Sequence, residues 1–561
     1  MPSITRILKR WDDFKAERST RDTLHQEIAD YTIPQQSNII ITRIEGQKQT
    51  EKLFDSTAIH SSGLLAASLH GTMTPSTQPW LSLRMRDEEL NTVKEVADWL
   101  EEVARRLHLA LRQSNFNTAV HEMYRQLVNF ATGVLFMQER PLLANGQFAG
   151  FQCQSVAWGA YAIAEDPEGR VDTLYRVRRM PRRSIIDKWP KAAFPKEFVD
   201  KARQKPDERA EVLHAVEPRR DRAYTVKGPK PGSKNMPWAS CYLLVSEKIL
   251  LDEGGFEEFP YMVPRWGKDA DETYGTGIGH IALPDIKTLN AAKEFLLKAA
   301  PLAMFPPTVE KDESVLGDPD LTPGGRNVVS GQGAMSDLFG FLEPRGRLDM
   351  TQLVLADLKQ SIKEMYFVPQ LQLQDGPQMT ATEVQVRWEL MQRFLGPTVG
   401  RLEAEFLNPL VERCFGIMAR ANALPPVPEA LRQLGAMADI DVEYEGPLAR
   451  AQRTIELTAQ DRVIGFAMQI DEKDPTSDEK AMDILDIDSI MRDRANITGL
   501  PSKNVRGEEQ VEAKRAGRRQ ARQTQEQMAQ TEQMAGAAGK AAPMLKELQA
   551  AAISGQNGSQ R

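Results

Sequence analysis

The chain has 561 residues, 41% hydrophobic and 27% charged, with a formal net charge of −7 at pH 7. This length exceeds what one hydrophobic core usually serves, so we expect several domains or an elongated body. The sequence argues against two classes, because no apolar run is long enough to predict a membrane span and three scattered cysteines form no disulfide framework. The basic surplus of a tight nucleic-acid binder is also missing, but this excludes little.

Residues 1–133 are predicted to be helical. Ile7, Trp11 and Phe14 recur at roughly helical spacing. The following segment FDSTAIHSSGLLAASLHGTMTP (residues 54–75) is rich in serine, alanine and glycine. Small side chains let backbones approach closely, so we expect a tightly packed helix that ends at Gly71.

Residues 134–280 have a different pattern. Short apolar runs such as GVLFMQ, FQCQSVAW and CYLLVSEKILLDEG are separated by Gly, Pro and Asp. This pattern is typical of short strands, and it predicts a β-rich domain with a helical insertion at residues 184–201.

Two long helices are predicted next, at residues 284–300 and 347–367. Pro284 suits the first turn of a helix, and Pro301 should end it. Between the helices, residues 302–346 contain five prolines and seven glycines. A connection of this length is usually functional rather than a plain link.

The remaining chain begins with a predicted loop at residues 368–379. TATE then has the spacing of a capping box, so Thr380 is the expected N-cap of a helix with kinks at Gly396-Pro397 and Asn408-Pro409. Ile440, Val442 and Tyr444 alternate with acidic residues and predict a strand. From about Lys503 onward few large apolar residues remain, which favours a helix that packs on partner copies and a disordered end.

Gly275, Gly277 and Gly279 raise the question of nucleotide binding. Their third glycine comes one residue too early for a dinucleotide fingerprint, and two prolines interrupt the preceding segment. No GxxxxGK[ST] motif occurs in the sequence. We therefore interpret these glycines as a backbone turn into the following helix.

Two acidic groups leave an enzymatic alternative open, because carboxylates of this kind bind Mg²⁺. They are Asp439, Asp441, Glu443 and Glu445, and Asp483, Asp486 and Asp488. A solvated strand face or helix surface explains them as well. The competing functions are thus a Mg-dependent DNA-processing enzyme and an internal scaffold protein.

Five segments, in this order, resemble the head-to-tail connector, or portal protein, of short-tailed bacteriophages (podovirus type). They are FDSTAIHSSGLLAASLHGTMTP, YGTGIGHIALPDIKTLN, GRLDMTQLVLADLKQSIKEMYFVPQL, MTATEVQVRWEL and YEGPLARAQR. Each is weakly specific alone, and their order along one chain is much more specific. The resemblance covers roughly residues 10–506.

The resemblance implies a mainly helical α+β portal fold that assembles as a ring, usually a dodecamer. Its regions would be an N-terminal helical part of the wing (1–133), a β-rich wing domain (134–280), a stem helix (281–301), the clip (302–346), a second stem helix (347–367), the channel loop (368–379), a kinked helix with a wing strand (380–450), and a helical crown (451–561).

It also implies a non-enzymatic virion protein at one capsid vertex, assembled in the host cytoplasm, with no cofactor, metal or membrane. Its partners would be double-stranded DNA that slides through during packaging and ejection, the terminase large subunit, tail adaptor or nozzle proteins, major capsid and scaffold proteins, and internal core proteins at the crown. A conduit that lets DNA slide avoids many fixed phosphate contacts, which agrees with the acidic composition.

Candidate residues follow from these regions. For the DNA channel we expect positive rings and a polar loop, formed by Lys287, Lys293, Arg347, Lys359, Lys363, Gln370, Gln372, Gln374, Asp375 and Gln378. For partner binding by the clip we expect Asp312, Glu313, Asp318, Asp320, Arg326 and Asp337. A surface salt bridge is the competing explanation for each channel lysine.

Overall fold

The computed structural model describes residues 4–41, 46–76, 79–87, 90–91, 93–141, 148–225, 228–229, 232–311, 320–329, 339–341, 348–371, 396–434, 440–444, 460–470, 485, 487, 490–491, 494, 510–525 and 527–528. These residues form a mixture of helices and strands, as the α+β prediction requires. The chain divides into two compact units. One comprises Met1–Arg86, Glu102–Val427 and Ala436–Ala449, and the other Asp87–Glu101, Pro428–Gly435 and Arg450–Arg561.

The N-terminal part is mostly helical, with one strand that the sequence analysis missed. Its helices are α1 (Ile4–Thr32), the short η1 (Pro34–Gln36), α2 (Thr57–Met73), α4 (Lys94–Gln113) and α5 (Phe116–Phe130). Gly71 lies inside α2 and does not end it. Strand β1 (Leu81–Met85) pairs antiparallel with β15 (Ile440–Tyr444), the strand predicted near the end of the larger unit. Its partner is so distant in sequence that local patterning gave little sign of β1.

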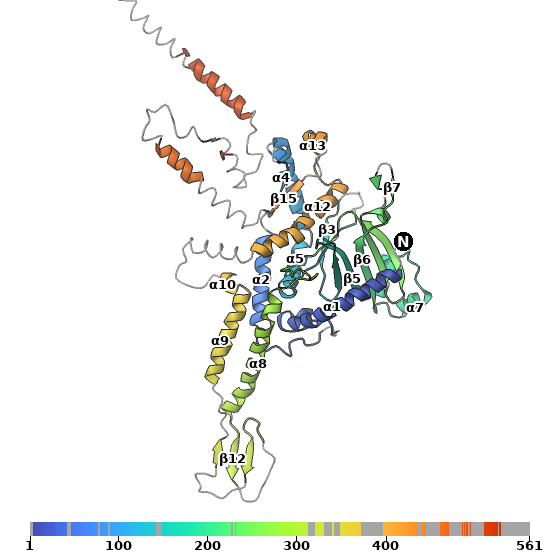
Figure 1. Cartoon of the computed structure of the whole chain (residues 1–561), viewed down its shortest axis with the longest axis vertical. Helices are drawn as coiled ribbons and strands as arrows, with labels where there is room; N and C mark the ends of the chain where they lie inside the picture. Colours follow the sequence, from blue (N-terminus) through green and yellow to red (C-terminus); the bar gives the residue numbers. More distant parts are fainter. Residues whose placement is uncertain are drawn as a thin grey trace, which may run out of the picture. The chain divides into compact units, whose positions relative to one another are not determined.

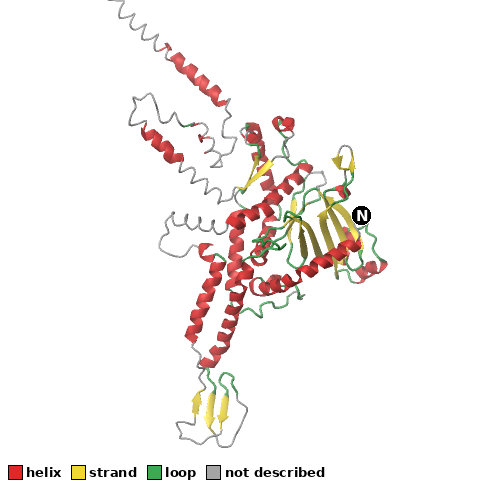
Figure 2. Cartoon of the chain, viewed as in Figure 1, coloured by secondary structure: helices red, strands yellow, loops and turns green. Residues whose placement is uncertain are grey.

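The strands expected after residue 133 are present (Figure 2). Strands β2 (Leu135–Glu139), β3 (Phe151–Ser155) and β11 (Tyr261–Met262) form a sheet in the order β11-β2-β3. A five-stranded antiparallel sheet has the order β10-β9-β6-β5-β4. Its members are β4 (Tyr161–Glu165), β5 (Val171–Pro181), β6 (Arg209–Pro218), β9 (Trp238–Leu244) and β10 (Ile249–Phe256). The helical insertion is α6 (Arg182–Lys188) and α7 (Lys196–Gln204), and the short elements β7 (Tyr224–Thr225), β8 (Gly228–Pro229) and η2 (Ser233–Asn235) follow β6.

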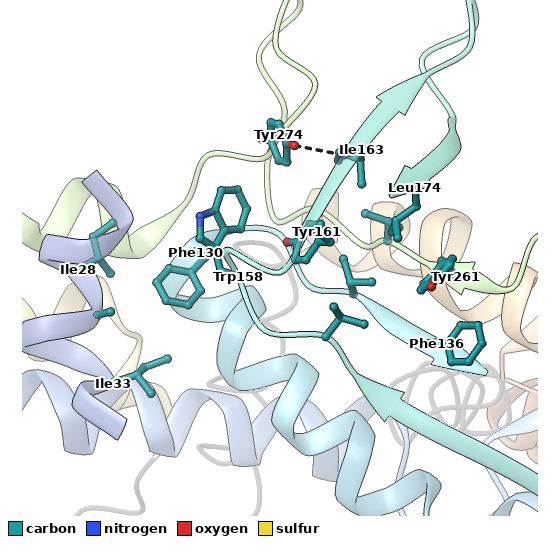
Figure 3. Packing of buried hydrophobic residues seen from close by; sticks show 14 of the residues in the cluster. Ile28, Ile33, Phe130, Phe136, Trp158, Tyr161, Ile163, Leu174, Tyr261 and Tyr274 are labelled. Carbon is teal, nitrogen blue, oxygen red and sulfur yellow. Dashed lines mark hydrogen bonds between the residues drawn. The ribbon is translucent and has the colours of Figure 1, made fainter. Parts of the chain in front are cut away.

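The five-stranded sheet has an apolar core on each face, because alternate strand residues point to opposite sides. On one face, Tyr175 and Leu213 pack with Ile7 and Trp11 of α1. On the other, Leu174 joins a cluster of aromatic and aliphatic side chains (Figure 3). Within that cluster the hydroxyl of Tyr274 accepts a hydrogen bond of 3.2 Å from the backbone N–H of Ile163, which ties the glycine-rich turn to β4.

Helix α8 (Ile278–Met304) is longer than the sequence predicted. The expectation that Pro284 lies in its first turn and that Pro301 ends it is wrong, because both prolines lie inside the helix. Gly277 is the N-cap, so the glycine turn starts the helix six residues before Pro284. Each internal proline removes one backbone hydrogen-bond donor. The remaining hydrogen bonds of this 27-residue helix maintain it despite the two missing donors.

Beyond α8, residues 302–346 contain three strands, where the sequence indicated only a long connection rich in glycine and proline. Strand β12 (Thr308–Lys311) lies between β13 (Arg326–Val329), parallel to it, and β14 (Phe339–Phe341), antiparallel to it. Helix α9 (Leu348–Met365) follows and nearly matches its prediction. The short helix α10 (Val368–Leu371) takes the start of the expected loop, so Gln370 is helical.

The kink expected at Asn408-Pro409 is a π-helical turn, Glu403–Leu407, directly before α12 (Asn408–Arg420). Pro409 has no N–H for the carbonyl of Glu405, so the α-helical hydrogen-bond pattern is interrupted there. In the smaller unit, α13 (Glu429–Leu434) and residues 460–470 and 510–525 are helical. Thr380 and the rest of the capping box lie outside the described residues. Within the described part of the chain, no helix combines the length and apolarity that crossing a membrane needs.

Candidate functional site

Helices α8 and α9 run side by side within the larger unit (Figure 1). Leu355 and Ile362 of α9 are seven residues apart, share one helix face and are buried. Ser361 on α9 donates a hydrogen bond of 3.0 Å from its hydroxyl to the carboxylate of Asp285 on α8. The two long helices predicted from the sequence are therefore neighbours in space, and we refer to them as the helix pair.

The three glycines around the start of α8 allow close backbone packing. A Cβ on Gly275 would lie 2.2 Å from the carbonyl oxygen of Ala131, and one on Gly279 would lie 2.0 Å from that of Asn129. Real side chains do not tolerate such distances, so only glycine fits here. The interpretation of these glycines as a turn into the helix is confirmed, and their neighbours in space are the end of α5.

A buried carboxylate joins the helix pair to the start of α2. Asp55 accepts ion pairs from Lys293 on α8 at 2.9 Å and from Lys359 on α9 at 3.4 Å, and its side chain is 3% exposed. Burial raises the pKa of Asp55, but hydrogen bonds from Thr57 and Lys293 outweigh it and lower the pKa to about 2. The side-chain oxygen of Asn290 on α8 accepts a hydrogen bond of 3.0 Å from the backbone N–H of Asp55. Two of the predicted channel lysines, Lys293 and Lys359, are thus engaged in ion pairs within this chain.

The other channel candidates occupy varied positions. Lys287 pairs with Glu27 of α1 at 3.0 Å, with both side chains about half exposed. Lys363 is exposed on α9, and Gln370 is exposed on α10. Arg347, Gln372, Gln374, Asp375 and Gln378 lie outside the described residues.

The three strands β12, β13 and β14 form a small sheet at the outer ends of the helix pair, which we call the tip sheet (Figure 1). Arg326 on β13 pairs with Glu310 on β12 at 2.7 Å. Asp320 accepts hydrogen bonds from the hydroxyl and the backbone N–H of Thr322 at 2.6 and 3.0 Å. Asp312, Glu313, Asp318 and Asp337 lie outside the described residues.

Large apolar side chains are exposed along the helix pair. Ile281 and Phe295 of α8 are each 69% exposed, and Leu353 of α9 is 68% exposed. Ile281 and Phe295 are four turns apart and therefore share one helix face. Solvent-exposed apolar rows of this kind mark contact surfaces for other proteins.

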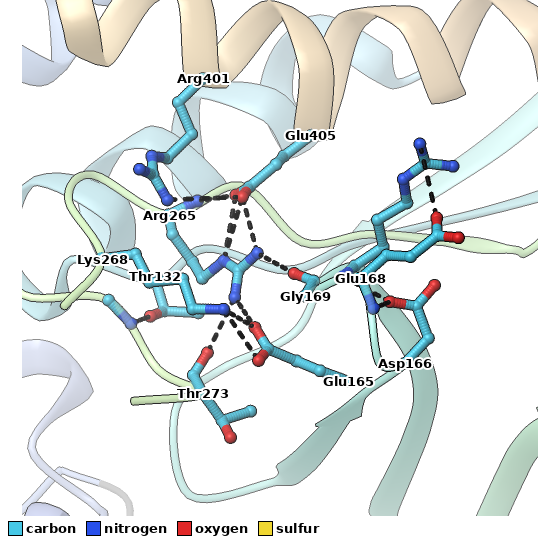
Figure 4. Close-up of polar contacts among 12 residues, drawn as sticks. Thr132, Glu165, Asp166, Glu168, Gly169, Arg265, Lys268, Thr273, Arg401 and Glu405 are labelled. Atoms are coloured by element: carbon cyan, nitrogen blue, oxygen red, sulfur yellow. Dashed lines mark hydrogen bonds and ion pairs between the residues drawn. The ribbon is translucent and has the colours of Figure 1, made fainter. Parts of the chain in front are cut away.

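A buried polar cluster centred on Arg265 was not predicted from the sequence (Figure 4). The guanidinium is 2% exposed and pairs with Glu405 of the π-helical turn at 2.6 Å and with Glu165 of β4. Lys268 also pairs with Glu165, at 2.8 Å. Arg265 and Glu405 are 140 positions apart, so no local spacing connects them. The kink predicted at Asn408-Pro409 was the sequence signal nearest to this contact, because Glu405 lies in the π-helical turn directly before it.

Neither acidic group forms a metal centre that the structure describes. Strand register places Asp441 opposite Arg84 and Glu443 opposite Ser82. The remaining acidic candidates, Asp439, Glu445, Asp483, Asp486 and Asp488, lie outside the described residues. Elsewhere in the described ranges, no group of three or more His, Cys, Asp or Glu side chains is placed to hold a metal ion.

The described residues thus define an α+β chain whose main exposed features are a helix pair with apolar rows and a tip sheet, which are features of an assembly protein. The family model for the bacteriophage head to tail connecting protein matches residues 5–505. The chain belongs to this family.

Two relatives have similar sequences. The probable portal protein of Bordetella phage BPP-1 is 30% identical over 470 residues, which cover 82% of this chain and 81% of that protein. The portal protein of Salmonella phage epsilon15 is 28% identical over 570 residues, covering 97% and 95%. The resemblance recognised in the sequence, and the phage portal role that it predicts, are thereby confirmed.

Proposed function

We propose that copies of this chain assemble into a ring, a dodecamer by family resemblance, at one vertex of the capsid. Double-stranded DNA would pass through its axial channel during packaging and ejection. In this arrangement the helix pair is the stem, the tip sheet belongs to the clip, residues 1–280 and the kinked helix make the wing, and residues 451–561 make the crown.

The exposed apolar rows of the helix pair carry this proposal. A single copy leaves Ile281, Phe295 and Leu353 in water, which costs free energy that a neighbouring helix pair would recover. A head-to-tail interface that closes on itself produces a ring, in which each helix pair has two neighbours. Long paired helices are also suited to lining a pore.

The channel wall follows from the same arrangement. Lys293 and Lys359 are held by Asp55, and Lys287 pairs with Glu27. Among the described channel lysines this leaves the exposed Lys363 for contact with phosphates. Repeated by the ring symmetry, one lysine per subunit gives a circle of positive charge that attracts DNA without base-specific contacts. The tip sheet would contact the terminase large subunit during packaging and tail adaptor or nozzle proteins afterwards.

Mass photometry and negative-stain microscopy of the purified chain test the ring. We expect particles of many copies with a central hole for the native chain, and a shift towards monomers for Leu353→Asp, which places a charge in the apolar interface. Gln352→Asp, which adds the same charge at the adjacent exposed position, is the matched control and should retain rings. Native chain that stays monomeric, or forms compact particles without a hole, contradicts the proposal and favours a scaffold role.

A further inference from the structure

A pocket of about 290 Å³ opens on one face of the five-stranded sheet, within the larger unit and away from the helix pair. Strands β5, β6 and β9 line it together with the end of α6 and with β2 and β3. It lies between the aromatic cluster around Phe136 and the smaller apolar cluster around Trp189. Nothing in the portal role explains why this pocket is polar.

Three cations line the pocket, and no acidic side chain does. Arg176 and Arg178 are two residues apart on β5 and therefore point to the same face of the sheet. Lys188 is the last residue of α6. None of the three has an ion pair with a carboxylate in the described part of the chain. Asp252 lies opposite Tyr242 on the outer strand β10 and does not line the pocket.

This lack of counter-charge sets the pocket apart from the other buried arginines. Arg18, Arg265 and Arg413 are each 2–3% exposed, and each pairs with a carboxylate. Arg176 is 8% exposed, and the partners that the described residues give it are uncharged: the hydroxyl of Tyr261 and the ring of Phe136. Buried charges are normally compensated, because desolvation of an unpaired ion costs several kcal/mol.

The three cations also repel one another. Partial burial and the nearby charge of Arg176 lower the pKa of Arg178. Burial, followed by the charges of Arg178 and Arg176, lowers the pKa of Lys188. A bound anion would relieve both the repulsion and the missing compensation, so the pocket is prepared for negative charge.

The remaining lining residues indicate the kind of anion. Lys188 lies 4.9 Å from the ring centre of Trp189 and 5.6 Å from that of Tyr242, so two aromatic faces adjoin the cations. His214 also lines the pocket, but both of its ring nitrogens are used in hydrogen bonds, to the hydroxyl of Tyr261 at 2.7 Å and to that of Ser240 at 3.0 Å. It therefore has no free nitrogen for a ligand. Three positive charges match a dianion better than a carboxylate, and guanidinium groups suit the oxygens of phosphate.

We propose that this pocket binds the phosphate group of a phosphomonoester, with Arg176, Arg178 and Lys188 as its ligands. Its volume exceeds that of a phosphate, which leaves room for an organic part against Trp189 and Tyr242. A phosphomonoester is largely dianionic at neutral pH, whereas each backbone phosphate of DNA is a monoanionic phosphodiester. The three cations therefore favour a small phosphomonoester over DNA.

Isothermal titration of the full-length chain with inorganic phosphate, with dAMP and with acetate, at constant ionic strength, tests the site. We expect saturable binding of phosphate and dAMP, and at least about tenfold weaker binding of acetate. The double variant R178Q/K188Q should weaken phosphate and dAMP binding about tenfold or more. Both side chains are exposed at the rim, so the variant should fold, which its circular dichroism and melting temperature check.

Arg179→Gln is the matched control. Arg179 lies next to Arg178 on β5 but points to the opposite face, where it pairs with Glu211 at 3.1 Å, so phosphate affinity should not change. A duplex without terminal phosphates should not compete with dAMP. Competition that R178Q/K188Q abolishes would show that the pocket binds the phosphodiester backbone of DNA, contrary to the proposal. Failure of every probe to bind, or equal affinity of the native chain and R178Q/K188Q, would overturn the proposal.

Discussion

At the scale of single residues, buried charges hold distant segments of the larger unit together. Asp55 joins α2 to both members of the helix pair, and Arg265 joins β4 to the kinked helix through Glu165 and Glu405. The sequence shows each of these residues as an ordinary charge. Side-chain partners more than a hundred positions apart leave no periodic signal, so the clusters could not be predicted.

Replacing Glu405 with glutamine should destabilise the larger unit strongly. The change leaves Arg265 buried with one carboxylate partner in place of two, and loss of one member of a buried pair typically costs about 3–5 kcal/mol. Thermal unfolding followed by circular dichroism measures the effect. Arg401→Gln is the control, because Arg401 approaches Glu405 only at 3.8 Å and is one-third exposed. Equal melting temperatures for the native chain and Glu405→Gln would contradict this role.

At the scale of elements, the sequence predicted those that depend on local periodicity. The helix pair, the strands after residue 133 and β15 were found because apolar residues recur at helical or strand spacing. The start of α8 was misplaced because a contact with α5, and not Pro284, decides where that helix begins. The tip strands are three or four residues long among glycines and prolines, which is too short for a clear alternating pattern.

Gly279→Ala tests the contact between the start of α8 and α5. The new methyl group would lie 2.0 Å from the carbonyl of Asn129, so the two backbones must separate, and we expect a loss of about 2 kcal/mol or more in unfolding free energy. Gly63→Ala inside α2 is the matched control. It meets nothing within 4 Å and should be neutral or stabilising by up to about 1 kcal/mol. Chemical denaturation of both variants decides, and a Gly279→Ala chain as stable as the native one would contradict the packing role of this glycine.

At the scale of the whole molecule, the order of segments identified the family, whereas the surfaces needed coordinates. Which candidate lysines are engaged within one subunit became visible only with Asp55 in place. Likewise, the apolar rows on the helix pair look like core positions in the sequence, because an apolar residue is expected to be buried whether its partner belongs to the same chain or to another copy. The phosphate pocket was missed for a related reason, since its cations come from β5 and α6 and meet only in the folded sheet.

The tip sheet allows assembly to be separated from partner attachment. Replacing residues 308–341 with a short glycine-serine linker removes β12, β13 and β14 and leaves α8 and α9 intact. The exposed apolar rows lie on those helices, so we expect ring particles of native copy number in negative stain. The same rings should fail to bind the terminase large subunit or tail adaptor proteins in pull-down assays, because the contacts assigned to the tip are gone.

Glu310→Gln removes one member of the exposed pair with Arg326 and is not among the expected partner-binding residues. It serves as the mild control and should retain both rings and most partner binding. If the linker variant no longer forms rings, the tip sheet is part of the subunit interface and its assignment as a docking element is wrong. If it forms rings that still bind both partners, the docking surface lies elsewhere on the chain.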